Sequence, residues 1–464
     1  MFKEVSFVFA FDGHTLYLTP LSDQKDAARS LTMTRYSTGC WASPGDPIYI
    51  ESKYLVLNPS NIPTRLVVFP SSDQFYPLVD MCGSMEVGVY MYFSMQPGSH
   101  SVSCIDFSSP FLNRSYDVLD ILGTTDFDEV TRTLTLTTRS VESVRCEVSL
   151  CSTQTEVSIF YNLSSRDRES HQPLAVSSVM RFKFEPTSDY ELVGNLVGIA
   201  NSYLCFITQT RNMVFENVRL REVRPLESEE AGELTTKYYS VRLGDVVING
   251  QDIGANVVGK QRLLLPIGAG CELERRVLQA LADGWLITRH LVPIDRTNDY
   301  DYPRCVMLAA SFDSTFNVLY PDGVRHHQAK VDAVEYISGV LMDIENDGDA
   351  TKTRGDTARW LRGILVDGDS FSSKLVQFWK DHEKLIRSYS LGAYAEQKRY
   401  AEFSERMQRM RNALAHGRID ISADKQLLLD VQFLERIVLW CQLLALGLDD
   451  DSVQDVMGRA TSNR

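Results

Sequence analysis

One short stretch of the sequence combines residue types that can act on a phosphodiester. Arg411 and His416 are separated by four residues, and Asn412 stands four positions before His416, so Asn412 and His416 share a face if the stretch is helical. RNA cleavage through its own 2′-hydroxyl needs a base for that hydroxyl, a cation for the charge that builds on the phosphoryl oxygens, and an acid for the departing 5′-oxygen. We expect Arg411 to clamp the phosphate, His416 to transfer protons, and Asn412 to orient the phosphate or the imidazole.

The position of His416 affects its chemistry. Gly417 is expected to end the helix and to leave His416 in the last turn, where unpaired carbonyls favour imidazolium while the nearby arginines oppose it. The pKa of His416 is therefore predicted to lie near neutral pH. The bare pattern also fits a second interpretation, in which His416 and an exposed Arg411 only complement the helix dipole.

The charge distribution restricts any contact with nucleic acid to a local surface. The net charge is −14, and residues 301–464 hold 21 Lys and Arg against 25 Asp and Glu, so most of the negative charge belongs to residues 1–300. The segment 398–418, called here the basic segment, has six basic residues and only two acidic ones. From it we predict four RNA-binding residues besides the catalytic ones: Lys398, Arg406, Arg409 and Arg418.

Residues 1–300 show the alternating pattern of antiparallel strands, which predicts a sandwich or barrel-like region. We expect this region to regulate the rest of the chain or to recognise a ligand. One helix is expected over Glu272–Ala282. The acidic stretch Glu222–Glu233 is interpreted as a long loop rather than a linker, with a possible subdivision near 222–234. Strands are predicted at Val5–Phe11, Ile48–Leu57, Arg65–Phe69, Met85–Met95, Val130–Thr138, Glu156–Tyr161, Val176–Phe184, Tyr203–Thr208 and Thr236–Asn249.

After the polar run Asp295–Pro303 the hydrophobic period changes from 2 to 3.6, which predicts an all-α domain over 301–464. In the last predicted helix the apolar residues form one stripe that is wide enough for the core of a bundle. The predicted helices are Cys305–Tyr320, Arg325–Glu345, Asp356–Val366, Ser372–Tyr389, Ala393–His416 and Asp424–Leu446.

The sequence holds no complete motif for a metal ion, a nucleotide or a serine hydrolase. The run Asp343–Asp349 begins like a calcium loop, but Arg354 stands where a bidentate Glu belongs, and no Walker A loop, HExxH or GxSxG occurs. His326 and His327 are neighbours whose side chains would diverge on a helix, so a surface or helix-start pair is favoured over a metal site. We therefore predict no metal and no cofactor.

Cysteine usage and hydropathy indicate the compartment. The nine cysteines form no CxxC pair, which favours a reducing cytoplasm over a secreted disulfide framework. The longest strongly apolar stretch, Ile437–Leu448, is shorter than the roughly 20 residues of a membrane span. We expect a cytoplasmic protein without a membrane partner.

The string Arg-Met-Arg-Asn-Ala-Leu-Ala-His-Gly at 409–417 resembles the HEPN ribonuclease signature in its Arg-Asn-x-x-x-His form, and residues 303–448 resemble the HEPN domain of ApeA-type antiphage proteins of prokaryotes. The resemblance implies a four-helix-type bundle that forms a homodimer, or a higher oligomer, with two motifs facing one another. It also implies metal-independent endoribonuclease activity that leaves a 2′,3′-cyclic phosphate and a 5′-hydroxyl. Cellular RNA such as tRNA would be the substrate, and a phage component could be the trigger.

Two other function classes remain open. The first is a non-catalytic binding protein, with a β-sandwich recognition module on a helical dimerisation bundle. The second is a carbohydrate-active β-sandwich enzyme, which would need paired carboxylates facing one groove. Substitution of Arg411 or His416 separates the first from a nuclease, because a binding protein would lose ligand affinity or oligomerisation instead of cleavage.

Overall fold

A computed structural model represents the protein. It describes residues 7–21, 23, 48–52, 64–70, 76–77, 83–94, 101–116, 122–128, 133–138, 144–165, 174–211, 214–230, 233–249, 265, 271–293, 296, 299–347, 351–366, 369–389, 394–415 and 425–462. The chain forms two compact units, of which unit 1 comprises 1–284, 291–297 and 456–464, and unit 2 comprises 285–290 and 298–455. The predicted fold class is confirmed, since an antiparallel β-rich region precedes a helical one.

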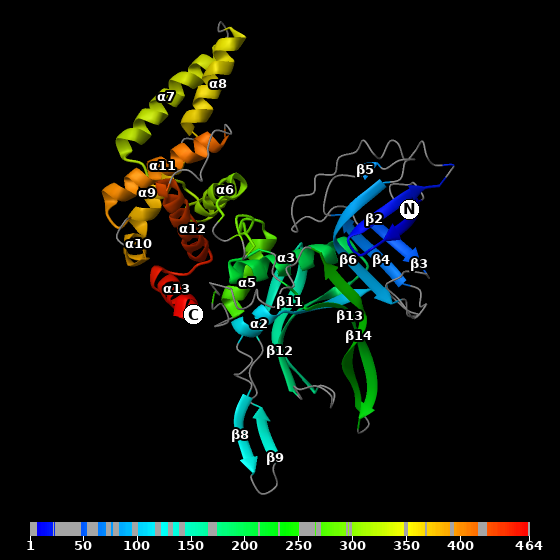
Figure 1. Ribbon diagram of the computed structural model, residues 1–464. Helices are drawn as coiled ribbons and strands as arrows, with labels where there is room; N and C mark the ends of the chain where they lie inside the picture. Colours follow the sequence, from blue (N-terminus) through cyan, green and yellow to red (C-terminus); the bar gives the residue numbers. More distant parts are fainter. Residues whose placement is uncertain are drawn as a thin grey trace. The chain divides into compact units, whose positions relative to one another are not determined.

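Unit 1 is built on a 12-stranded sheet whose main path runs β1-β2-β6-β14-β13-β7-β12-β11-β10, and its strand pairs are antiparallel (Figure 1). β4 and β5 pair with β6, β3 pairs with β4, and β8 and β9 form a separate ribbon. The strands are β1 (Phe7–Phe11), β2 (Thr15–Pro20), β3 (Ile48–Ser52), β4 (Thr64–Pro70), β5 (Tyr76–Pro77), β6 (Gly83–Ser94), β7 (Val102–Ser108), β8 (Leu122–Asp128), β9 (Thr133–Thr138), β10 (Val144–Leu150), β11 (Thr153–Ser165), β12 (Leu174–Thr187), β13 (Asn217–Glu230) and β14 (Glu233–Ile248).

In the part of 1–284 that the structure describes, the helices that accompany the sheet are α2 (Pro110–Ser115), α3 (Tyr190–Thr208) and α5 (Cys271–Ala282). α3 packs closely on the strands, because a Cβ on Gly194 would lie 2.9 Å from the Phe69 ring. The prediction of a strand at Tyr203–Thr208 is wrong, since these residues form the last turns of α3. α3 is long and apolar enough to span a membrane, yet 78% of that segment is buried inside the protein, which is the environment of a core helix.

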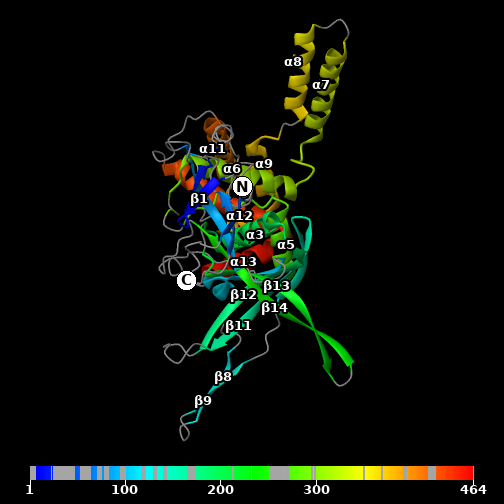
Figure 2. The same cartoon turned by 90° about the vertical axis from the view of Figure 1, so that its right-hand side faces the viewer.

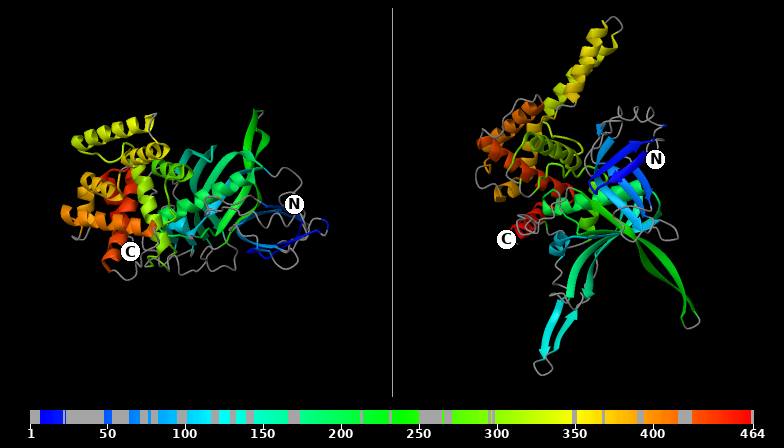
Figure 3. Two further views of the ribbon diagram at one scale, coloured as in Figure 1. Left: turned by 90° about the horizontal axis from the view of Figure 1, so that it is seen from above. Right: turned by 45° about the vertical axis from the view of Figure 1, so that its right-hand side comes forward.

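The described residues of the acidic stretch, 222–230 and 233, form strands and not the predicted loop. Glu222–Glu230 belongs to β13, which pairs with β14 along its whole length and forms a long hairpin, visible in both views of Figure 3. The charged residues of this segment do not alternate strictly, so the pairing of β13 with β14, and not a period-2 pattern, makes it a strand.

Unit 2 is helical, and the predicted helix Ser372–Tyr389 is in fact two helices that are separated at His382. α13 was not predicted. The described helices of unit 2 are α6 (Tyr302–Leu319), α7 (Gln328–Asn346), α8 (Lys352–Val366), α9 (Phe371–Asp381), α10 (Glu383–Tyr389), α11 (Gln397–Ala415) and α12 (Lys425–Ala445). A further helix, α13 (Asp450–Ser462), begins in unit 2, and its residues 456–462 belong to unit 1.

The core of unit 2 lies among α6, α9, α11 and α12. Six positions of the apolar stripe predicted on α12 are buried: Val431, Leu434, Ile437, Val438, Cys441 and Leu444. Aromatic rings close the core toward α11, where Tyr394 stacks on Phe433 at 4.2 Å between centroids and Phe403 meets Phe433 edge-on. This packing fixes the orientation of α11, which carries Arg411 and Asn412 of the predicted motif.

Candidate active site

α11 has one buried face and one solvated face. Its buried apolar residues follow the spacing of a single helix face: Tyr400, Phe403, Met407, Met410 and Leu414. Lys398, Arg409, Arg411 and Asn412 are exposed. The sequence of α11 therefore forms an amphipathic helix that presents Arg411 and Asn412 to solvent near its C-terminal end.

Arg406 anchors α11 to α12. Its Nε and Nη2 donate to the two oxygens of Asp430, at 2.5 and 3.0 Å, and Tyr394 and Gln426 donate to the same carboxylate. Asp430 is fully buried. The hydrogen bond to Asp430 raises the pKa of Arg406, and burial raises that of Tyr394. Arg406 therefore has a structural role, because both oxygens of Asp430 hold its guanidinium in place. Its contact with RNA stays a prediction.

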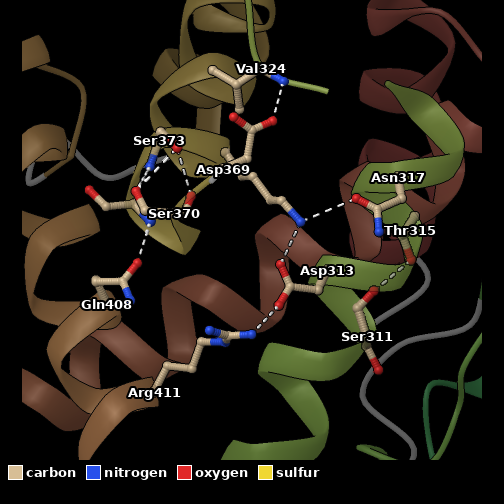
Figure 4. A network of polar contacts seen from close by, with 12 residues as sticks. Ser311, Asp313, Thr315, Asn317, Val324, Asp369, Ser370, Ser373, Gln408 and Arg411 are labelled. Carbon is tan, nitrogen blue, oxygen red and sulfur yellow. Dashed lines mark hydrogen bonds and ion pairs between the residues drawn. The ribbon is translucent and has the colours of Figure 1, made fainter. Parts of the chain in front are cut away.

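Arg411 belongs to a polar cluster at the meeting point of α6, α9 and α11, which Figure 4 shows from close by. Its Nη2 lies 3.1 Å from Oδ2 of Asp313 on α6. Lys374 on α9 donates to the other oxygen of Asp313, at 3.1 Å, and also to Asn317. Two cations thus share one carboxylate, which leaves a local excess of one positive charge.

The guanidinium of Arg411 remains accessible. The side chain is 48% exposed, whereas Asp313 and Lys374 are largely covered. Its carbon lies 5.9 Å from the centre of the Phe371 ring, which supports the flat group from one side. Because Arg has five N–H donors in a rigid fork, a half-exposed guanidinium can bind a phosphate while Asp313 orients it.

Asn412 is oriented by a chain of hydrogen bonds. The backbone N–H of Ser372 donates to Oε1 of Gln408, and Nε2 of Gln408 donates to Oδ1 of Asn412 at 3.0 Å. Since the oxygen of Asn412 already accepts a bond, its amide nitrogen is the end that can donate to a phosphate or to an imidazole.

α11 ends at Ala415, and Tyr302 on α6 donates to the carbonyl of Leu414 in this last turn. His416, Gly417 and Arg418 lie outside the described residues. The helical neighbourhood of Asn412 and His416, the glycine cap and the RNA contact of Arg418 therefore stay predictions.

The other histidines of unit 2 have structural partners. His290 is buried, burial lowers its pKa to about 3, and its Nδ1 lies 3.0 Å from Oγ of Ser311. His326 and His382 pair with Asp369 and Asp450. His327 is the N-cap of α7, as the sequence favoured. His416 is the one further histidine in the sequence of this unit.

Sequence reasoning missed Asp313, Asn317 and Lys374. These residues come from α6 and α9, far from Arg411 in the chain, and no motif joins them. The nearest signal was the mixture of polar residues on otherwise apolar helices, which by itself only indicates a solvated face.

Comparison with known proteins adds no relative. The chain matches no protein-family model, and no curated protein or solved structure shows significant similarity to it. The site is therefore interpreted from its own geometry.

Proposed function

We propose that unit 2 is a HEPN-type endoribonuclease that cleaves RNA without a metal ion, with Arg411, Asn412 and His416 as its catalytic residues. The observation that carries this proposal is the half-exposed guanidinium of Arg411, which Asp313 orients in a positively charged cluster five residues before His416. A residue that served only the helix dipole would not need a carboxylate and a second cation to hold it.

The geometry supports a division of roles. Without RNA, Asp313 pairs with Nη2 of Arg411 and leaves the other N–H donors of the guanidinium to a ligand. A scissile phosphate that approaches Arg411 competes with this carboxylate, and Lys374 keeps Asp313 neutralised as Arg411 turns to the phosphate. The 2′-oxygen then attacks phosphorus while the bond to the 5′-oxygen breaks. His416 removes the 2′-proton or protonates the 5′-oxygen, and Arg411 offsets the charge on the phosphoryl oxygens.

A second copy of the motif completes the acid–base pair. One imidazole cannot be base and acid in the same step, so a homodimer in which two motifs face one RNA supplies both. The products are a 2′,3′-cyclic phosphate and a 5′-hydroxyl. Lys398 and Arg409, both exposed on α11 ahead of the motif, would hold the RNA backbone that leads to it.

The biological role follows from the two-part chain. A ribonuclease that acts on tRNA or another cellular RNA in the cytoplasm harms its own cell and must be restrained. We assign this control to unit 1, whose β-rich region would respond to a phage-derived trigger. The protein would then act as an abortive-infection toxin in antiphage defence.

Cleavage of total RNA by purified protein tests the proposal. We expect the wild type to cut RNA, and Arg411→Ala and His416→Ala to lose at least a hundredfold in rate. Arg399→Ala is the matched control, because Arg399 is an exposed arginine of α11 that pairs only loosely with Glu396, at 3.6 Å. Equal cleavage by wild type and both motif variants would contradict the enzyme. If the wild type cuts no RNA and the two motif variants lose RNA affinity or dimerisation, the result would support a binding protein instead.

A further inference from the structure

α7 and α8 form a helical hairpin whose outer side is not covered by the described part of unit 2. α7 is 19 residues long and has no buried residue. Its inner side faces α8, since Glu345 pairs with Arg359 and Arg362 at 2.7 and 2.9 Å. Figures 1 and 2 show the hairpin extending away from α6, α9, α11 and α12. A helix pair in this position can bury its other side only against something else.

The outer side of α7 is apolar along a regular stripe. Its exposed residues follow the spacing i, i+4, i+7, i+8 and i+11: Ala329, Ala333, Tyr336, Ile337 and Val340. On α8, Trp360 is 64% exposed and Leu361 is also exposed. The stripe on α7 is distinct from the row of Val331, Val334 and Leu341, which is half-buried on the side of Glu345. The hairpin therefore has two apolar sides, one of which is used internally.

The two helices carry opposite charge. α7 has four acidic residues and one basic residue, whereas α8 has four basic residues and one acidic residue: Lys330, Asp332, Glu335, Asp343, Glu345, Lys352, Arg354, Asp356, Arg359 and Arg362. An RNA or an anionic membrane laid along α7 would meet a net charge of −3, from four acidic residues and one basic residue. A second copy of the same hairpin offers a basic helix for α7 and an acidic helix for α8.

We propose that two copies of this chain associate through the hairpins, with α7 of one copy against α8 of the other. Two-fold pairing of this kind makes an antiparallel four-helix bundle in which each neighbour is opposite in direction and in charge. Pairing of α7 with its own copy would set like charges together. A 19-residue helix is about 28 Å long and the pair is about 20 Å wide, so the contact buries about 1,100 Å² in total, at the lower end of specific interfaces.

Removal of apolar side chains tests the surface. The mass of the full-length protein is measured by light scattering during gel filtration over a range of concentrations. We expect a dimer whose dissociation constant rises at least tenfold in the double variant Tyr336→Ser, Val340→Ser. Tyr238→Ser is the matched control, because Tyr238 on β14 is 72% exposed and Tyr336 is 74% exposed. A monomeric wild type, or a dimer that the double variant does not weaken, would overturn the proposal.

A charge exchange tests the pairing of α7 with α8. Variant A carries Asp343→Lys on α7, and variant B carries Arg359→Glu on α8. These two positions lie at the same level of the bundle, because the neighbouring Glu345 pairs with Arg359, and both side chains are exposed. Each variant alone sets like charges across both contacts and should dimerise at least tenfold more weakly, while an equimolar mixture should restore a heterodimer. Failure of the mixture to associate would refute this arrangement.

The inference does not require ribonuclease activity, because its measurement is mass. RNA cleavage by the same samples separates the two proposals. If the hairpin variants lose the dimer and neither they nor the wild type cleave RNA, the hairpin contact is supported and the nuclease is refuted. A nuclease whose mass is indifferent to the hairpin variants would give the reverse result.

Discussion

Glu274 should make the stability of unit 1 fall as pH rises. Its side chain is 1% exposed, Tyr116 donates to Oε1 at 3.2 Å, and among the described residues Oε2 has no partner. Tyr116 in turn lies 2.8 Å from the hydroxyl of Tyr203. Burial raises the pKa of Glu274 from 4.5 to about 7, although the bond from Tyr116 acts in the opposite direction. The folded protein therefore holds this proton over a pH range in which the unfolded chain has released it.

The sign and size follow from linkage. A raised carboxyl pKa has no effect on stability below pH 4.5, and its destabilising effect grows until about pH 7. The full rise of the pKa, from 4.5 to about 7, corresponds to about 3 kcal/mol. Between pH 5 and pH 8.5 the wild type should lose about 2.5 kcal/mol relative to Glu274→Gln, which cannot ionise.

Urea unfolding of both proteins at several pH values measures this difference. Glu272→Gln is the control, because Glu272 is exposed on the same helix and its pKa, lowered to about 2 by hydrogen bonds from Arg275 and Arg276, lies below the range tested. Its difference from wild type should stay nearly constant from pH 5 to 8.5. If the difference between wild type and Glu274→Gln is equally flat, the carboxyl is not held protonated and the reasoning fails.

Three further substitutions test packing and charge. Asp430→Asn should destabilise the protein by about 3 kcal/mol in urea unfolding, because it removes the fully buried carboxylate that holds the half-buried guanidinium of Arg406; a change below 1 kcal/mol would contradict the anchor. Gly244→Ala should destabilise by about 3 kcal/mol or prevent folding, since the new Cβ would lie 2.0 Å from the carbonyl oxygen of Tyr92, and a wild-type melting temperature would refute this close approach. Asp313→Asn should bind RNA more tightly and with a steeper salt dependence in a fluorescence titration, because one negative charge leaves the side of Arg411; weaker binding would assign Asp313 to RNA contact instead.

Much of the helical architecture followed from the sequence because period 3.6 is strong where one side of a helix is solvated. α11 is such a helix, with Arg411 and Asn412 exposed opposite its buried face, whereas α12 has a solvated side only in its first half, since Ile437–Leu444 are all buried. α3 gave no such period: most of its residues are buried, so its aromatic and β-branched residues were mistaken for a strand at Tyr203–Thr208.

Long-range partners could not be predicted. The ion pairs of Asp313 with Lys374 and Arg411 depend on the packing of three helices, which no local spacing encodes. The same holds for the burial of Glu274 against Tyr116, which lies 158 positions earlier in the chain. The break between α9 and α10 at His382 also depends on a long-range contact, because Nδ1 of His382 lies 2.6 Å from Oδ1 of Asp450 on α13.

The chemistry of the cut ends tests the central claim most directly. Purified wild type and His416→Ala are incubated with total RNA in EDTA, and the termini of the fragments are mapped. We predict 2′,3′-cyclic phosphates and 5′-hydroxyls with the wild type, and intact RNA with the variant. Fragments that end in 3′-hydroxyls and 5′-phosphates, or identical cutting by the variant, would contradict catalysis by Arg411 and His416.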